Sequence, residues 1–162
     1  MGLSDLQKGR IIEQLVGATL TLQSEGTLRV SVPLVDDEGV DLVVGNRLND
    51  KTLLLQIKSR FVLAYKGRYR ANVRRATCKP DPNKFLLFVF YEKASAALGE
   101  SCWLIRATDF CRLLSKQARK DNKYLFISTF TSPRDMWKPY RLSVKDLAKK
   151  IEKELQVITS SS

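Results

Sequence analysis

The sequence of 162 residues contains no histidine, three cysteines and no hydrophobic run of membrane-spanning length. The lack of imidazole excludes Ser-His-Asp and Cys-His catalysis and the usual zinc hydrolase sites. Cys78, Cys102 and Cys111 are odd in number and lack CxxC spacing, which indicates neither a disulfide framework nor a zinc site. The N-terminus has no basic region followed by an apolar run. We therefore expect a soluble, cytoplasmic protein without a membrane partner.

Acidic residues are also absent from one long segment. Residues 51–80 contain no Asp or Glu but carry nine Lys and Arg, in a chain whose net charge is +11. Such a local excess favours a polyanionic partner, with nucleic acid first. Cations can pair with phosphates, while tyrosine rings can stack on sugars or bases. The residues expected to contact nucleic acid are Arg60, Lys66, Arg68, Arg70, Asn72, Arg74, Arg75, Lys79, Tyr65 and Tyr69.

The most informative feature present is an apolar hairpin, residues 40–44 and 52–57, in which Asp41, Gln56 and Lys58 are the polar side chains beyond Thr52. Strand interiors exclude such groups unless they are paired or used. Because side chains alternate along a strand, Gln56 and Lys58 share a face. A carboxylate, an amide and an ammonium on one patch suit a divalent cation held against a phosphate. The alternative places Asp41 in a turn and Lys58 at an exposed strand end.

The basic segment follows this cluster directly, with Lys66-Gly67 as a turn between two short extended stretches. Taken alone, it is typical of a solvated hairpin whose aromatic side chains pack on the core. Its position changes this interpretation, because a phosphodiester brought to the cluster needs its neighbouring phosphates neutralised. We therefore expect DNA or RNA contact here.

The remaining elements are predicted from periodicity and capping signals. Ser4 and Gln7 form a capping box that begins a helix over residues 4–23. The patterns then predict strands over 28–35, 84–91, 101–106 and 124–130, and helices over 108–120 and 143–158. The order is helix, three strands, basic ribbon, two strands, helix, strand, helix. This order predicts one mixed α/β domain with helices on the faces of its sheet.

These residues resemble the PD-(D/E)XK nuclease superfamily. The resemblance rests on Glu13 in the first helix, Asp41 after Gly39-Val40, and the tripeptide Gln56-Ile57-Lys58, and it covers about the first third of the chain by motif. The chain is similar to members with a Q-x-K motif, such as Mrr-like restriction nucleases and some intron-encoded homing endonucleases. Archaeal Holliday junction resolvases are more distant relatives. The implied fold is a restriction-endonuclease-like mixed β-sheet flanked by helices, with residues 60–80 as an inserted basic β-ribbon. The single domain would span 1–158, followed by a frayed tail at 159–162.

The resemblance also implies roles for these residues. Asp41 would be the principal Mg²⁺ ligand, with Gln56 and the Ile57 carbonyl as further ligands, and Mn²⁺ would substitute. Glu13 would be an auxiliary ligand or a base. Lys58 would orient the attacking water and stabilise the transition state. Gln56 departs from the carboxylate found in most members, which removes a negative charge and should weaken Mg²⁺ binding.

The expected function is hydrolysis of phosphodiester bonds in double-stranded DNA by a metal-activated water, of homing or restriction type. Cleavage of a duplex needs two active sites, so we expect a homodimer or tetramer. Three alternatives stay open: a catalytically inactive nucleic-acid-binding module on the same fold, a Holliday junction resolvase, and an RNA-binding protein without nuclease ancestry. The last alternative predicts tolerance of substitution at Glu13 and Asp41, together with sensitivity at Tyr65 and Tyr69.

Overall fold

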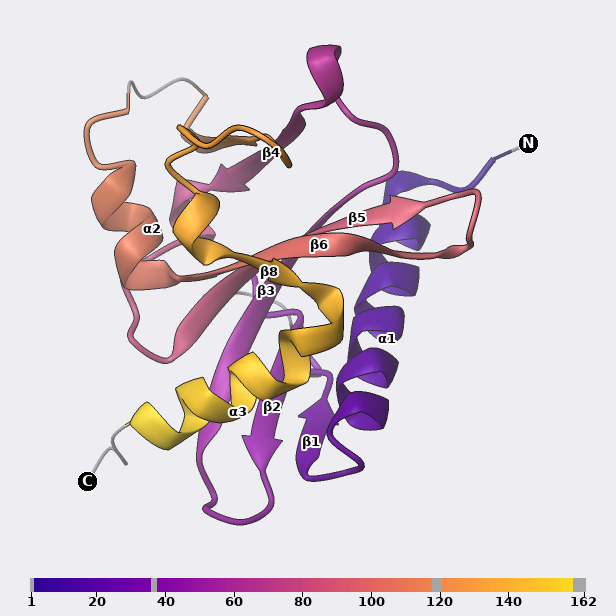
Figure 1. The fold of residues 1–162 in the computed structure, drawn as a ribbon. Coiled ribbons are helices and arrows are strands. Elements are labelled where there is room, and N and C mark those ends of the chain that lie inside the picture. Colours follow the sequence, from indigo (N-terminus) through magenta and orange to yellow (C-terminus); the bar gives the residue numbers. More distant parts are fainter. Residues whose placement is uncertain (1, 36–37, 118–120, 159–162) are drawn as a thin grey trace.

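The computed structural model describes residues 2–35, 38–117 and 121–158. The predicted tail, 159–162, lies outside these residues. The α-helices and strands of the described residues are, in chain order, α1 (Asp5–Gln23), β1 (Leu28–Ser31), β2 (Leu42–Asn46), β3 (Thr52–Arg60), β4 (Tyr69–Arg74), β5 (Lys84–Glu92), β6 (Ala97–Arg106), α2 (Ala107–Leu113), β7 (Lys123–Ser128), β8 (Arg141–Ser143) and α3 (Leu147–Val157). Figure 1 shows their arrangement.

Within the described residues the strands form a six-stranded sheet of order β1-β2-β3-β5-β6-β8 and a two-stranded sheet of β4 and β7. The β3–β5 pair is parallel, whereas the other pairs in the six-stranded sheet are antiparallel. The predicted mixed α/β sheet flanked by helices is therefore confirmed. No helix in this part of the chain is both long and apolar enough to cross a membrane.

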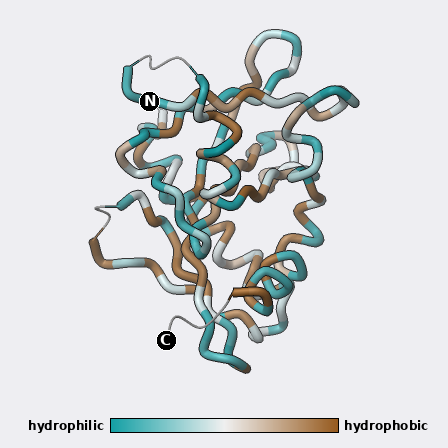
Figure 2. Tube along the Cα trace, turned by 90° about the vertical axis from the view of Figure 1, so that its left-hand side faces the viewer, coloured by the Kyte–Doolittle hydropathy of each residue, from teal (hydrophilic) through white to brown (hydrophobic). Residues whose placement is uncertain are grey.

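The six-stranded sheet is covered on both faces. Phe85 and Leu87 of β5 point to a core shared with α1 and α3, which we call the helical core. Leu86 and Phe88, one position out of phase, point to a core shared with α2, β4 and β7, which we call the aromatic core. A strand buried on both faces requires a continuous apolar run, and residues 85–91 supply it. In Figure 2 hydrophobic segments run through the middle of the molecule, and many of the segments at its periphery are hydrophilic.

Helix α1 carries the predicted capping box. The Ser4 hydroxyl accepts a hydrogen bond from the Gln7 N–H, and the Gln7 side chain accepts one from the Ser4 N–H. A Cβ at Gly17 would lie 3.4 Å from a Val30 methyl group, so the small residue allows α1 to approach β1 closely. The absence of a side chain at Gly17 thereby permits the short distance between α1 and the sheet.

The basic segment departs from the prediction. Residues 60–80 contribute one strand, β4, whose partner is β7 rather than a neighbouring stretch of the same segment. Around Lys66 and Gly67 the chain does turn, but the pairing there is a single bridge between Ala64 and Arg68. The physical reason is burial: alternate side chains of β4 must cover the aromatic core, and β7 extends the same apolar face. The ribbon is thus formed by two segments far apart in sequence.

Other element ends also differ from the prediction, among them those of β1, α2, β6 and α3, which begins at Leu147 rather than at 143. Strand β1 ends at Ser31 because Pro33 cannot donate to a strand ladder. Helix α2 ends at Leu113; soon after it, the Gln117 side chain makes two hydrogen bonds to the Leu125 main chain of β7. The predicted continuation to 118–120 lies outside the described residues. Strand β6 begins at Ala97, earlier than predicted.

Replacing Phe88 by alanine should cost about 3–5 kcal/mol of unfolding free energy, the usual loss for a buried phenylalanine. Phe88 is fully buried, and its ring stacks on Phe126 with centroids 3.9 Å apart. Equilibrium unfolding in urea measures the loss. Tyr65→Ala is the control, because this side chain is 77% exposed, and it should change stability by less than about 0.5 kcal/mol. Similar losses in the two variants would contradict this packing.

Candidate functional site

A cleft opens between the first turns of α1 and the end of β3. Its cavity volume is 420 Å³, and the residues that line it include Glu13, Asp41, Ile57 and Lys58. The structure therefore brings four of the five residues predicted as catalytic or metal-binding to one cavity. The fifth, Gln56, is buried and does not line it.

A second cavity, of 520 Å³, is lined by residues that include Thr77, Lys79 and Lys84. The cleft between α1 and β3 is the candidate active site.

Asp41 lies directly before β2 and is held by the main chain of β3. Its N–H donates to the Leu55 carbonyl at 2.8 Å, and its carboxylate accepts a hydrogen bond from the Ile57 N–H at 2.5 Å. Hydrogen bonds to a carboxylate are stronger than those between neutral groups. The sheet thus fixes the direction of the Asp41 side chain toward the Ile57 peptide.

Gln56 is 2% exposed and belongs to the opposite side-chain series of β3 from Leu55 and Ile57. Its amide nitrogen donates to the Thr77 hydroxyl at 3.1 Å. Its amide oxygen, Oε1, is buried and accepts no hydrogen bond from any described residue. An orphaned buried acceptor costs about 1–3 kcal/mol, so this atom is a place where the structure could gain from a ligand.

Lys58 is half-buried and lines the cleft, and its main chain is held in place by Tyr69. The Tyr69 hydroxyl donates to the Lys58 carbonyl at 2.6 Å. Tyr69 is fully buried in the aromatic core, and this burial raises the pKa of its hydroxyl. The prediction that Tyr69 stacks on nucleic acid is therefore wrong: its ring supports the strand that carries Lys58.

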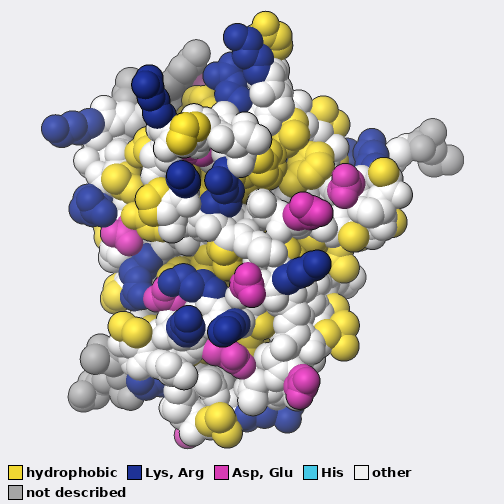
Figure 3. Space-filling model, in the orientation of Figure 1, with side chains coloured by type: hydrophobic (Ala, Val, Ile, Leu, Met, Phe, Trp, Pro, Cys, Tyr) yellow, Lys and Arg dark blue, Asp and Glu magenta, His cyan; other side chains and the backbone are white. Residues whose placement is uncertain are grey.

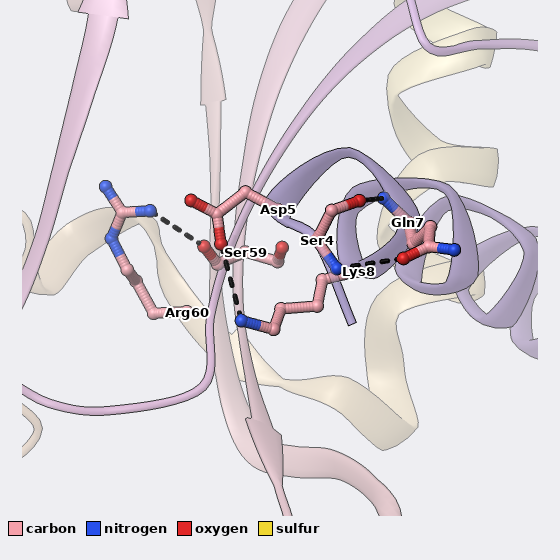
Figure 4. Close-up of polar contacts among 6 residues, drawn as sticks. All are labelled: Ser4, Asp5, Gln7, Lys8, Ser59 and Arg60. Carbon is pink, nitrogen blue, oxygen red and sulfur yellow. Dashed lines mark hydrogen bonds and ion pairs between the residues drawn. The ribbon is translucent and has the colours of Figure 1, made fainter. Parts of the chain in front are cut away.

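The entrance of the cleft combines the first turn of α1 with the end of β3 (Figure 4). Lys8 pairs with Asp5 at 3.3 Å, and the Arg60 guanidinium donates to the Ser59 carbonyl at 3.2 Å. Lys8 was not among the residues predicted from the sequence. Its spacing from Glu13 is not that of a shared helix face, so the sequence gives little signal for it. Cations from α1 and β3 thus flank the cleft.

The outer face of the β4–β7 ribbon is basic and exposed. Along β4 the side chains alternate, with Tyr69 buried and Arg70, Asn72 and Arg74 exposed. Lys123 of β7 lies opposite Arg74, a position that the sequence reasoning missed because it depends on a distant pairing. The other exposed residues predicted to contact nucleic acid are Arg60, Tyr65, Lys66, Arg68 and Lys79. Figure 3 shows Lys and Arg side chains around the loop at the top of the molecule, whereas over α3 they mix with acidic side chains.

Arg75 does not belong to this exposed row. Its guanidinium donates to the Gln117 carbonyl at 3.0 Å and lies 4.1 Å from the centroid of the Tyr124 ring. These contacts connect the end of β4 to the segment after α2 and to β7. The structure therefore gives Arg75 a role inside the protein, apart from the predicted nucleic-acid contacts.

The oxygen donors around the cleft fit Mg²⁺. Mg²⁺ prefers oxygen ligands and is commonly held by one or two carboxylates together with substrate phosphates. Glu13 and Asp41 supply two carboxylates that line the cleft. Gln56 precedes the lining residue Ile57 on β3, and its amide oxygen is buried without a hydrogen-bond partner among the described residues. Among the described residues no three His, Cys, Asp or Glu side chains group closely enough to hold a metal, so an amide or main-chain oxygen would have to complete the set.

The cysteines do not contribute to this site. All three are free and buried, and Cys78 contacts Cys111 with the sulfur atoms 3.6 Å apart. Burial raises the pKa of the Cys102 thiol to about 12 and also raises that of the Cys78 thiol. Protonated thiols are poor nucleophiles and poor metal ligands, so these side chains act as packing groups.

Comparisons with known proteins support the fold. No family model matches the sequence, and no curated protein matches it. Among solved structures, the chain is similar to a bacterial homing endonuclease, I-Ssp6803I, with a TM-score of 0.58 and 20% sequence identity. The similarity covers 98% of this chain and 100% of that chain. The protein therefore has a nuclease-like mixed α/β fold over nearly its whole length.

Proposed function

We propose that this protein is a Mg²⁺-dependent endonuclease that hydrolyses phosphodiester bonds in double-stranded DNA. The observation that carries the proposal is the meeting of Glu13, Asp41 and Lys58 in one cleft, on a nuclease-like fold. The neighbouring Gln56 amide oxygen, buried without a partner among the described residues, adds a further candidate ligand. A carboxylate pair beside a lysine is suited to a cation and a phosphate together.

Each residue has a role in this proposal. Asp41 and Glu13, with Gln56 Oε1 and the Ile57 carbonyl, would hold Mg²⁺. When bound there, Mg²⁺ would lower the pKa of a water molecule and neutralise charge on the phosphate. Lys58 would orient the water and stabilise the negative charge that develops on the phosphoryl oxygens. In the reaction the water oxygen forms a bond to phosphorus while the bond from phosphorus to a sugar oxygen breaks.

The basic ribbon would bind the DNA backbone next to the cleft. Tyr69 connects the two directly, since it belongs to β4 and donates to the main chain of Lys58. Arg60 adds a second link, because its guanidinium donates to the Arg70 carbonyl at 2.6 Å. We propose site-specific cleavage, of homing or restriction type, by a homodimer or tetramer that supplies one site per strand. Cleavage of branched DNA, as by a Holliday junction resolvase, is the alternative substrate.

Cleavage of supercoiled plasmid and of long random-sequence DNA tests the proposal. The protein should nick or cut these substrates with Mg²⁺ or Mn²⁺, and EDTA should stop the reaction. Discrete fragments would identify sequence recognition, and a preference for synthetic four-way junctions would identify a resolvase. The proposal fails if none of these DNAs is cut by a folded protein at any concentration of either metal ion.

Substitution of Arg70 and Arg74 together by glutamine should weaken DNA binding at low salt and reduce its salt dependence. The slope of log K against log salt concentration falls by about 0.9 for each phosphate contact removed, so we expect a change of about 2. Fluorescence anisotropy over a salt series measures it. Lys149→Gln with Lys153→Gln on α3 is the matched control, since it removes the same charge from exposed positions elsewhere. Equal slopes for the two double variants would contradict a specific role for the ribbon.

One observation favours a second candidate, a non-catalytic DNA-binding module on the same fold. Gln56 is neutral where a third carboxylate would strengthen metal binding, and its side chain is buried. This candidate predicts salt-sensitive DNA binding that is indifferent to Asp41 and Lys58 substitutions, with no cleavage under any of the conditions above.

A further inference from the structure

The Thr77 hydroxyl makes two hydrogen bonds, and together they fix the orientation of the Gln56 amide. Thr77 Oγ1 donates to the Arg74 carbonyl at 3.2 Å and accepts from Gln56 Nε2 at 3.1 Å. A hydroxyl has one proton to donate. Because the Thr77 hydroxyl donates its one proton to the Arg74 carbonyl, it can only accept a hydrogen bond from Gln56. The amide nitrogen must therefore face Thr77, which leaves Oε1 at the other end.

The neighbouring residues hold Thr77 against this amide. A Cβ at Gly39 would lie 2.7 Å from Gln56 Nε2 and 2.7 Å from the Thr77 Cβ, so the glycine permits the close approach of all three. Lys84, which is 5% exposed, donates to the carbonyls of Thr77 and Glu38, both at 2.6 Å. A buried ammonium thereby connects the segment before Asp41 to the turn that carries Thr77. The Gln56 amide is thus buried beside two segments, at Glu38 and at Thr77, that both contact the Lys84 ammonium.

We propose that Thr77 is a positioning residue that presents Gln56 Oε1, rather than its NH₂ group, to the metal ion. The inference rests on the proposed function and extends it to a residue outside the Q-x-K motif. An amide is a metal ligand through its oxygen, whereas its NH₂ group can only donate. A glutamine ligand therefore needs its amide orientation fixed. A glutamate would not, because both of its carboxylate atoms are oxygens. By fixing the orientation of the amide, Thr77 would allow a glutamine to serve as a ligand where a carboxylate would otherwise stand.

Thr77→Val should weaken Mn²⁺ binding about 10–100-fold, because partners that orient a metal ligand typically have effects of this size. The free Mn²⁺ signal in electron paramagnetic resonance measures the affinity without any DNA. The cleavage rate at low Mn²⁺ should fall in parallel and recover as Mn²⁺ is raised, a pattern that general destabilisation does not produce. Thr77→Ser, which keeps the hydroxyl, should restore both affinity and rate.

Two further variants support this test. Thr77→Ala removes the same hydroxyl and leaves a smaller side chain. It replaces Thr77→Val in the measurements if the valine variant melts at a much lower temperature than the wild-type protein. Thr21→Val on α1 is the matched control, because its hydroxyl also donates to a main-chain carbonyl, that of Gly17. It should leave Mn²⁺ affinity unchanged.

The outcomes separate this inference from the function on which it rests. If the wild-type protein binds Mn²⁺ and cuts DNA, and Thr77→Val and Thr77→Ala match it in affinity and rate, the inference fails while the nuclease function stands. If the wild-type protein neither binds Mn²⁺ nor cuts DNA, the nuclease function fails and the inference with it. A loss that Thr77→Ser does not restore would also overturn the inference, since it would reflect packing rather than the hydroxyl.

Discussion

Asp41→Asn is expected to reduce DNA cleavage about 10³-fold or more, while the protein stays folded and binds DNA at least as tightly as before. Asparagine keeps an oxygen that can accept the hydrogen bond from the Ile57 N–H, so the local structure should persist. The change removes the negative charge on which metal binding depends. A loss of about 4 kcal/mol of transition-state stabilisation corresponds to this factor.

Single-turnover cleavage with the protein in excess over DNA measures the effect of Asp41→Asn on the reaction itself. Anisotropy measurements on the same samples give the affinity, and circular dichroism verifies the fold. Cleavage within tenfold of the wild-type rate would show that Asp41 is not the principal ligand. A parallel loss of cleavage, DNA binding and folded structure would instead assign Asp41 a structural role.

Lys58→Met is expected to slow cleavage about 10²–10³-fold, the usual cost of removing one preorganised donor from a developing oxyanion. Methionine has a similar length without the charge. The Lys58 main chain should stay in place, because its carbonyl is held by the buried Tyr69 hydroxyl. Single-turnover cleavage again measures the rate.

The two substitutions should differ in their effect on metal binding. Lys58→Met removes a positive charge next to the metal ligands, so Mn²⁺ affinity should stay equal or rise. Asp41→Asn should lower it. This contrast assigns distinct roles to two residues of one cleft. A loss of Mn²⁺ binding in both variants would contradict the role given to Lys58.

The sequence predicted much of the candidate site because its main elements are local. The β2–β3 hairpin pairs neighbouring segments, as predicted. Gln56 and Lys58 are two positions apart on β3, but only Lys58 lines the cleft. The capping box correctly predicted where α1 begins. These signals arise from residues a few positions apart, where geometry follows directly from the type of element.

Contacts between distant segments were not predictable in the same way. The pairing of β4 with β7 joins residues more than 40 positions apart, and nothing within either strand specifies its partner. The burial of Tyr69 did have a signal: Tyr69, Ala71 and Val73 alternate with Arg70, Asn72 and Arg74, which is the pattern of a half-buried strand. The basic residues around Tyr69 favoured a nucleic-acid contact, and the alternation was given less weight than their charge.

The partner of Gln56 also depends on a long-range contact. Thr77 is 21 residues away in sequence and reaches the amide only because β3, the loop at Gly39 and the turn after β4 meet at one point. A threonine in a basic segment carries no sequence signal for such a role. This position could be found only once the buried amide and its unsatisfied oxygen were seen together.

The central claim is that Asp41, Gln56 and the Ile57 peptide surround a metal site. Titration of Mn²⁺ into ¹⁵N-labelled protein tests it directly, because the paramagnetic ion broadens the resonances of nuclei close to it. We expect saturable broadening, first at the main-chain amides of Asp41 and Ile57 and at the Gln56 side-chain amide, and its loss in Asp41→Asn. Broadening centred on another part of the chain, or unchanged in Asp41→Asn, would contradict the account.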